Sequence, residues 1–302
     1  MKNEFYFPST NGVDRIHVME WIPMGEVVAV LQIAHGMVEH IARYDTFGAY
    51  LARNGIYVVG NSHLGHGKSV SYPENMGYFH EPDGNACVVG DIHKLRMLTQ
   101  EKYPGVPYFM MGHSMGSFLL RQYLGTHGQG LAGAIIMGTG EQPTPVVQAG
   151  KLVCRVIAAF KGWKHRSDFV NGMVIGGFEK QMEKAWLSRN EENVKAYAAD
   201  PLSGFVFTLN AFYNMFDGMV KMNKQEQGGM IPKKLPIFFV AGSEDPVGGC
   251  GKGVKAVYDR YVTLGAEKAS MKLYPEDRHE ILNELDKQMV FDDLLNWILE
   301  NR

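Results

Sequence analysis

Short runs of apolar residues, each followed by a polar or glycine-rich loop, recur along the first and last parts of the chain. Nearly continuous apolar runs are typical of strands buried on both faces of a parallel sheet. Between them lie segments with apolar residues every three or four positions, which predict helices. The strands predicted in this way are 27–34, 56–59, 108–111, 134–137, 235–240 and 270–274. Strands that alternate with helices predict an α/β protein with a mostly parallel sheet covered on both faces.

One segment near the N-terminus has a different pattern. Apolar and polar residues alternate from 14 to 21, which predicts an exposed strand that pairs antiparallel with its neighbour. The helices predicted between the strands are 44–53, 90–102, 252–265 and 288–299. Asn54-Gly55 and Gly265 stand where two of these helices should end.

After residue 140 the pattern becomes helical throughout. Thr144-Pro145 is a favourable N-cap and first helical residue, and apolar residues behind it recur at helical spacing. Further helical segments are predicted around 178–187, 191–199 and 205–222, before the polar, glycine-rich stretch 224–229. We therefore expect an α/β core made of residues 1–140 and 233–302, with a helical cap at residues 141–232.

The turn Gly112-His113-Ser114-Met115-Gly116 follows a predicted strand and precedes a predicted helix. The pattern G-x-S-x-G in this context is typical of a nucleophile elbow. In such a tight turn a Cβ at Gly112 or Gly116 would clash with the neighbouring backbone. Ser114, at the apex, would have a strained backbone and an accessible side chain beside helical amides that favour negative charge. The pattern alone also fits a glycine-rich turn capped by Ser114, so its catalytic partners must be sought elsewhere.

A serine nucleophile needs an imidazole base. In proteins with this elbow the partners follow the serine in the order Ser, Asp or Glu, His. Of the 11 histidines, only His127, His165 and His279 come after Ser114. His279 alone lies in a loop after the last predicted strand, so we take it as the base.

A carboxylate must orient that imidazole. Asp245 follows the penultimate predicted strand in Gly-Ser-Glu-Asp-Pro and is the candidate acid. Glu244 and Asp277 are competitors, and a turn at Asp245-Pro246 would also account for an aspartate there. For the oxyanion hole, the Met115 amide follows the nucleophile, and the Met37 amide follows the strand at 27–34.

Other motifs in the loops have the wrong spacing. His35 to His40 is one residue longer than H-x-x-E-H, and Gly67-Lys68-Ser69 lacks the first glycine of a P-loop because position 62 is serine. His63 and His66 could bind a metal, but no cysteine or carboxylate pair lies nearby, and hydrogen bonds within the loop are the better explanation. We expect neither metal nor cofactor.

Composition narrows the class of protein further. The net charge is −2, and 45% of residues are hydrophobic and 21% charged, as in globular proteins. Scattered Lys and Arg argue against a nucleic-acid partner. No stretch approaches the roughly 20 apolar residues of a membrane-spanning helix, and residues 1–8 lack the apolar region of a signal peptide. Cys87, Cys154 and Cys250 are odd in number and widely spaced, so we expect a reducing, cytoplasmic location.

Taken in chain order, five motifs resemble those of the α/β-hydrolase fold, and within it the monoacylglycerol lipase and lysophospholipase-like serine hydrolases of the serine aminopeptidase S33 type. They are His35-Gly36-Met37-Val38-Glu39-His40 with Arg43-Tyr44, Gly65-His66-Gly67-Lys68-Ser69, the elbow, Gly242-Ser243-Glu244-Asp245-Pro246-Val247, and Arg278-His279-Glu280-Ile281-Leu282-Asn283-Glu284. The resemblance implies a Ser114, Asp245 and His279 triad, an oxyanion hole from the Met37 and Met115 amides, and a cap after the strand at 134–137. The chain departs from the family at Ser62 and Leu64, where Asp and Arg are common, which concerns loop contacts rather than the chemistry.

We therefore expect an enzyme that hydrolyses a small-molecule acyl ester, monoacylglycerol-like or lysophospholipid-like, through an acyl-enzyme intermediate. The Met- and Phe-rich segment 205–222 predicts an apolar acyl pocket, although core packing would explain it equally well. The residues expected to line the substrate site are Gly36, His113, Phe212, Met215 and Phe216. Such a cap could also touch a lipid surface transiently. Two alternatives stay open: an aminopeptidase or amidase with the same triad, and a hydrolase-like ligand sensor with little turnover.

Overall fold

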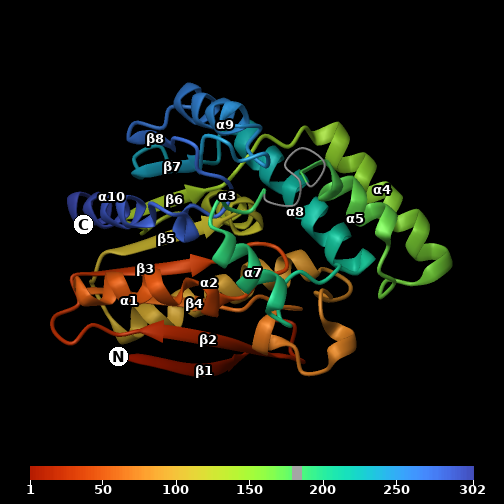
Figure 1. Ribbon diagram of the computed structural model, residues 1–302, viewed down its shortest axis with the longest axis horizontal. Coiled ribbons are helices and arrows are strands. Elements are labelled where there is room, and N and C mark those ends of the chain that lie inside the picture. The colour runs from red at the N-terminus through yellow and green to blue at the C-terminus, as the bar shows by residue number, and fades with distance from the viewer. Residues whose placement is uncertain (179–185) are drawn as a thin grey trace.

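A central sheet organises the molecule (Figure 1). The computed structural model describes residues 1–178 and 186–302, and within these the strands form one eight-stranded sheet in the order β1-β2-β4-β3-β5-β6-β7-β8. The strands are β1 Lys2–Pro8, β2 Arg15–Trp21, β3 Ala29–Ala34, β4 Ile56–Asn61, β5 Tyr108–His113, β6 Gly133–Met137, β7 Ile237–Gly242 and β8 Ala269–Tyr274. Strands β3 to β8 pair in parallel, and β1 and β2 pair antiparallel at one edge. The predicted α/β class is confirmed.

Helices cover both faces of the sheet, which explains the continuous apolar runs. Helices α1 (Asp45–Arg53) and α10 (Lys287–Glu300) pack on one face, and α2 (Gly84–Lys102), α3 (Met115–His127) and α9 (Lys252–Thr263) pack on the other. In β3, the side chains of Leu31 and Ile33 pack in the core on the face covered by α1 and α10, and Val30 packs in the core on the opposite face. Because side chains alternate between the two faces, both sets must be apolar.

The N-terminal edge differs from its prediction. The antiparallel pairing of β2 is as predicted, but the strand is buried rather than exposed, because Ile16 and Val18 reach one core while Met19 and Trp21 reach the other. The polar strand β1 was not predicted, and it pairs with β2 along its whole length.

Two predicted helix starts shift for local reasons. Helix α2 begins at Gly84 rather than residue 90, because the Asp83 side chain caps it by accepting a hydrogen bond from the Ala86 amide at 3.1 Å. Helix α4 (Thr144–Lys161) has Pro143 at its N-cap, so Thr144 is the first helical residue rather than the cap.

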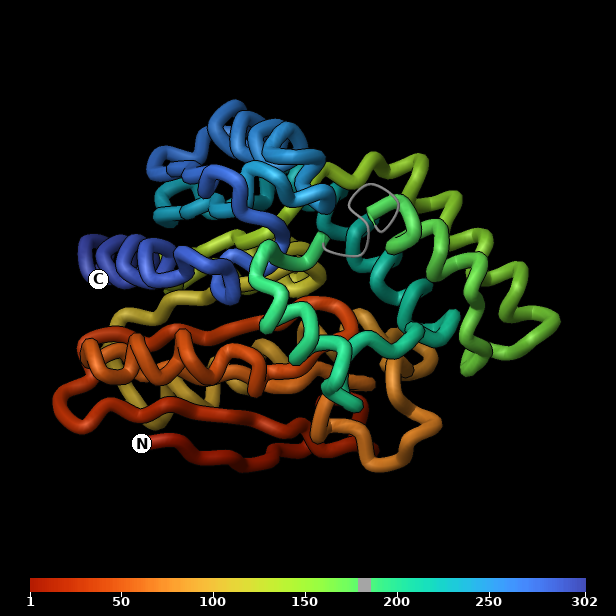
Figure 2. Tube along the Cα trace, in the orientation of Figure 1, coloured from red at the N-terminus to blue at the C-terminus, as the bar shows by residue number. Residues whose placement is uncertain are grey.

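A helical insertion separates β6, which ends at Met137, from β7, which begins at Ile237, and it lies beyond the carboxyl ends of the parallel strands (Figure 1). Its described helices are α4, α5 (Asp168–Val174), α7 (Glu191–Ala199) and α8 (Leu209–Gln227). Thr208 caps α8 through a 3.3 Å hydrogen bond from the Ala211 amide, so Phe205 and Phe207 precede the helix instead of lying in it. The helix predicted around 178–187 lies mostly outside the described residues. Both termini are at the opposite end of the molecule (Figure 2).

A buried ion pair fastens the insertion to the core. Arg121 of α3 donates two hydrogen bonds to Glu226 of α8, at 2.8 and 2.9 Å, and both side chains are almost fully buried. The Tyr261 hydroxyl of α9 donates a third to Glu226 at 2.9 Å. Within residues 1–178 and 186–302, no helix combines the length and apolarity that crossing a bilayer requires.

Candidate active site

Ser114 lies at the apex of the turn between β5 and α3, and the tight packing of this turn gives it an unusual backbone conformation. Its φ of 53° and ψ of −121° lie in a region that residues with a side chain rarely adopt. A Cβ at Gly112 would come within 2.2 Å of the Gly116 carbonyl oxygen, and one at Gly116 within 2.0 Å of the Ala34 oxygen. The predicted need for both glycines, and the strain at Ser114, are confirmed.

Hydrogen bonds on both sides hold this strained backbone. The Ser114 amide donates to the Met137 carbonyl at the end of β6 at 3.0 Å. The Ser117 hydroxyl donates to the Ser114 carbonyl at 2.6 Å. Ser114 itself is only partly buried, so its side chain stays accessible at the carboxyl end of the sheet.

Asp245 and His279 form a buried pair at the carboxyl ends of β7 and β8. The Nδ1–H of His279 donates to Asp245 Oδ2 at 2.9 Å, which leaves Nε2 unprotonated in the neutral ring. The second carboxylate oxygen accepts from the Val247 amide at 2.9 Å. Asp245 therefore makes the local turn that the sequence allowed and also contacts the imidazole.

The competing carboxylates point elsewhere. Glu244 has a side chain that is 47% exposed and approaches Arg278 at 3.9 Å. Asp277 is buried against Arg189 of the insertion. Burial, together with the nearby carboxylate of Asp286, raises the pKa of Asp277 to about 7, which makes it a poor permanent anion.

The loop after β3 presents the Met37 amide. His35 Nδ1–H donates to the Gly36 carbonyl at 2.8 Å, and because a trans peptide sets C=O and N–H in opposite directions, the Met37 N–H points away from His35. A Cβ at Gly36 would lie 3.1 Å from that of Ser114, so this loop approaches the elbow closely. Met115 is the first residue of α3 and has no intrahelical acceptor. Neither amide donates a hydrogen bond to another described residue.

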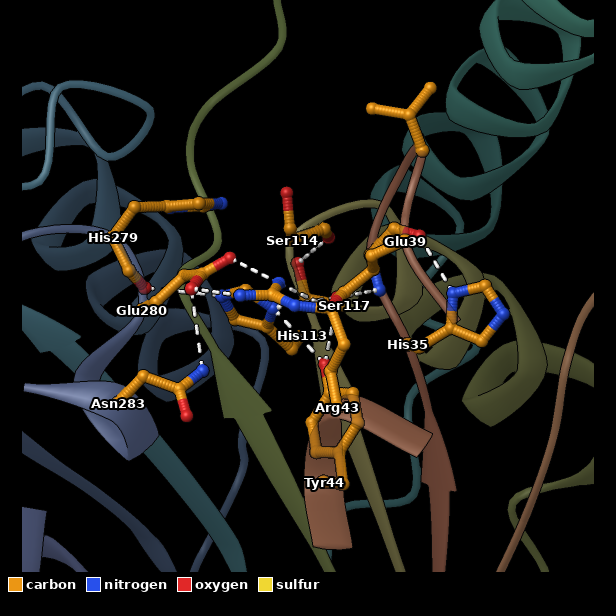
Figure 3. A network of polar contacts seen from close by, with 12 residues as sticks. His35, Glu39, Arg43, Tyr44, His113, Ser114, Ser117, His279, Glu280 and Asn283 are labelled. Carbon is orange, nitrogen blue, oxygen red and sulfur yellow. Dashed lines mark hydrogen bonds and ion pairs between the residues drawn. The ribbon is translucent and has the colours of Figure 1, made fainter. Parts of the chain in front are cut away.

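A buried polar network, not predicted from the sequence, lies beneath these groups (Figure 3). Glu39 accepts hydrogen bonds from the Gly36 amide at 2.6 Å, Arg43 at 3.0 Å and the Tyr44 hydroxyl at 2.9 Å. Arg43 also donates twice to Glu280, at 2.6 and 2.7 Å. Glu39, Arg43 and Glu280 all lie in the motifs quoted above, but nothing in their spacing indicated that they meet.

His113 connects this network to His279. Its Nδ1 is 3.4 Å from Glu39 Oε1, and its Nε2–H donates to the His279 carbonyl at 3.1 Å. Burial alone would lower the pKa of His113, but the hydrogen bond and charge of Glu39 outweigh it and raise that pKa. Burial opposes ionisation of Glu39 as well, yet His113 and Arg43 hold the pKa of Glu39 well below its usual range. The loop after β3, the elbow and the His279 loop are thus joined by one charged cluster.

A cavity of about 910 Å³ opens between this site and the helical insertion. Ser114, Met37, Met115 and His279 line its polar end, and Gly36, His113, Met215 and Phe216 line it as the sequence suggested. Apolar walls are provided by Phe118, Val147, Val153, Met215, Phe216 and Met219. Phe212 is different, because it is fully buried with its ring 5.4 Å from that of Phe207, so it packs in the core instead of lining the cavity.

The histidines of the loop after β4 bond within the fold. The His63 amide donates to His35 Nε2 at 2.9 Å, and His66 Nδ1–H donates to the Leu64 carbonyl at 2.9 Å. Among the described residues no set of three or more His, Cys, Asp or Glu side chains is arranged to hold a metal ion. Loop hydrogen bonding, the explanation preferred from the sequence, is confirmed.

A parallel sheet with a serine elbow, an aspartate–histidine pair after its last two strands and a helical insertion defines an α/β-hydrolase. The family model described as serine aminopeptidase, S33, matches residues 25–286, so the chain belongs to that family. The resemblance drawn from the five motifs is therefore confirmed.

Similar proteins span nearly the whole chain. A monoacylglycerol lipase of Mycolicibacterium smegmatis is 26% identical over 303 residues, which cover 99% of this chain and 98% of that protein. A monoglyceride lipase of Rattus norvegicus is 26% identical, over 92% of this chain and 84% of its own length. The crystal structure of a thermostable carboxyl esterase from Bacillus coagulans, in complex with glycerol, superposes with a TM-score of 0.91 at 30% identity and covers 99% of this chain and 98% of its own.

Proposed function

We propose that the protein hydrolyses monoacylglycerol-like esters through Ser114, His279 and Asp245. Membership of the carboxylic ester hydrolases is indicated by the lipase and esterase relatives, which this chain covers over 84–98% of their lengths. The observation that carries the catalytic assignment is the 2.9 Å Asp245–His279 contact, because His279 lines the same cavity as Ser114.

The reaction would proceed in two stages. Ser114 Oγ attacks the acyl carbonyl while His279 Nε2 takes the hydroxyl proton, and Asp245 stabilises the imidazolium. The Met37 and Met115 amides bind the oxyanion. His279 then protonates the leaving alcohol, and in the second stage it activates a water molecule that hydrolyses the acyl-enzyme. The helical insertion would act as a cap whose apolar wall holds the acyl chain.

The charge around the cavity favours a neutral head group over a phosphate. No lysine or arginine among the described residues lines the cavity, whereas Glu39 and Glu280 do. Arg43 is already bound to both of these carboxylates. Phosphate recognition in proteins relies on available Arg or Lys donors, so a monoacylglycerol fits this site better than a lysophospholipid.

This charge preference predicts a difference between two substrates that share an acyl chain. The kcat/KM for a 1-acyl lysophosphatidate should be about 10- to 100-fold lower than for the matching monoacylglycerol, which corresponds to about 1.4–2.8 kcal/mol, since the phosphate would lie near carboxylates of like charge. In the Glu280→Gln variant the gap should narrow, because one of the two carboxylates that neutralise Arg43 is removed. Equal rates of the two substrates in the wild-type protein would contradict the charge argument.

The outer face of the insertion has a surface suited to lipid. Phe160 at the end of α4 and Phe169 in α5 are 85% and 65% exposed. Val146 and Met173 are exposed as well and also line the cavity, so the apolar surface continues into the site. We propose that this surface touches the lipid aggregate transiently while substrate enters.

Charged substitutions on this surface should separate lipid contact from catalysis. The double variant Phe160→Asp with Phe169→Asp should lose about tenfold or more of its activity on emulsified long-chain monoacylglycerol. Full burial of a ring contributes about 1.5–3 kcal/mol, and a transient contact realises only part of that. Hydrolysis of dissolved p-nitrophenyl acetate should not change, since the triad is untouched. A parallel loss on both substrates, or on neither, would reject the lipid contact.

A panel of p-nitrophenyl esters from acetyl to dodecanoyl tests the proposed function. Rates that peak at medium or long chains, and that vanish in Ser114→Ala, support the acyl pocket. Hydrolysis of the acetyl ester alone would be consistent with the triad. It would mean that the apolar residues of the wall only pack in the core and do not bind an acyl chain. Cleavage of amides in preference to esters would favour an aminopeptidase. Acylation without turnover would favour a ligand sensor.

A further inference from the structure

Val38, next to the Met37 amide, has a backbone conformation that a β-branched residue rarely takes. Its φ is 50°, in the left-handed region that favours glycine, and its side chain is almost fully buried. Such a residue persists only where its surroundings hold it in place. The contacts that hold Val38 in this conformation matter because this residue follows Met37, whose amide is one of the two proposed oxyanion donors.

Hydrogen bonds fix the backbone on both sides of the Met37 N–H. The Gly36 amide donates to Glu39, and the Gly36 carbonyl accepts from His35. On the far side, the Val38 amide donates to His66 Nε2 at 3.3 Å. Among the backbone N–H groups of Gly36, Met37 and Val38, only that of Met37 donates to no described residue, as an oxyanion donor requires.

The Val38 carbonyl is also fixed, by two hydrogen bonds from the helical insertion. It accepts a hydrogen bond from the Tyr197 hydroxyl of α7 at 3.2 Å and another from the Gly204 amide at 2.9 Å. The Tyr197 ring also lies over the Arg43 guanidinium, 4.8 Å from its centroid, and Arg43 binds Glu39. Helix α7 thus contacts the Val38 carbonyl directly and also contacts Arg43, which binds Glu39.

We propose that Tyr197 is a positioning residue for the oxyanion hole: its hydroxyl, acting from the insertion, keeps Val38 left-handed and so aims the Met37 amide at the reacting carbonyl. This inference rests on the proposed ester hydrolysis at Ser114. It goes beyond that proposal by making the insertion part of the catalytic machinery as well as a wall of the acyl pocket. A loop in which Val38 relaxed to an ordinary φ would turn the neighbouring peptide and weaken the oxyanion contact.

The variant Tyr197→Phe removes the hydroxyl and leaves the ring over Arg43. It should lower kcat about tenfold with little change in KM, less than the 100- to 1,000-fold loss of deleting an oxyanion donor outright. Affinity for a trifluoromethyl ketone, which forms a tetrahedral adduct, should fall in proportion. Tyr213→Phe, in the same insertion but away from the cavity, serves as the matched control and should retain wild-type turnover.

A double-mutant cycle with Val38→Gly separates positioning from a direct substrate contact. Glycine adopts a positive φ at little cost, so in the Val38→Gly background the Tyr197→Phe change should alter kcat by less than about twofold. A tenfold loss in both backgrounds, or no loss in either, would overturn the inference while leaving the ester hydrolase intact. Absence of Ser114-dependent hydrolysis by the wild-type protein would reject the proposed function and this inference with it.

Discussion

The Ser114→Ala variant should lose ester hydrolysis on the order of a millionfold in kcat, because the enzyme then has no nucleophile to form the acyl-enzyme. Substrate affinity should change little, since the methyl group occupies the same turn and the cavity keeps its walls. Steady-state kinetics on a monoacylglycerol would measure the loss, and thermal unfolding would show that the elbow still folds.

Ser117→Ala is the control for this prediction. Ser117 lies in the first turn of α3, and its hydroxyl supports the Ser114 carbonyl at 2.6 Å. The loss of one such hydrogen bond costs about 0.5–1.5 kcal/mol, so activity should fall by about tenfold at most. If Ser114→Ala kept more than a small fraction of the wild-type rate, or if Ser117→Ala matched its loss, the nucleophile would be misassigned.

The Asp245→Asn variant should lose about ten-thousand-fold in kcat with its fold intact. An asparagine at this position can donate to His279 Nδ1 and stabilise the tautomer whose Nε2 carries the proton, which is the wrong state for a base. It also removes the charge that stabilises the imidazolium. The measurement is kcat as a function of pH, and the activity should return partly at high pH, where hydroxide can replace the missing base.

Glu244→Gln provides the matched carboxylate change one residue earlier. Its side chain is half-exposed and lies toward Arg278 rather than His279, so turnover should stay near the wild-type value. A larger loss of kcat in Glu244→Gln than in Asp245→Asn would mean that Glu244, and not Asp245, is the carboxylate that orients His279. Substitution of Asp277 should lower the free energy of unfolding, because it removes the contact with Arg189, and should change turnover less.

The parts of the fold that depend on local pattern could be predicted from the sequence. Apolar runs placed the parallel strands to within a few residues, since strands covered on both faces must be apolar throughout. Strand β1 could not be found in this way, because Lys2, Asn3 and Glu4 are polar and the strand exists through its pairing with β2. The burial of β2 was missed because an alternating pattern does not indicate that other elements cover both of its faces.

The candidate site was predictable where chain order restricts the choice. Ser114, Asp245 and His279 each follow a strand, and strands that end at the same edge bring their loops together. The network of Glu39, Arg43 and Glu280 could not be deduced, because 237 residues separate Arg43 from Glu280. The strain at Val38 could not be predicted either, since no motif indicates a positive φ at that residue as the elbow motif does at Ser114.

Covalent trapping of the nucleophile tests the central claim most directly. A long-chain alkyl fluorophosphonate should react at a single serine with loss of fluoride, and peptide mass spectrometry should place the adduct on Ser114. Excess monoacylglycerol should slow the labelling, because both compounds would occupy the same cavity. An adduct on any other residue, or no adduct on a protein that still hydrolyses monoacylglycerol, would contradict the account.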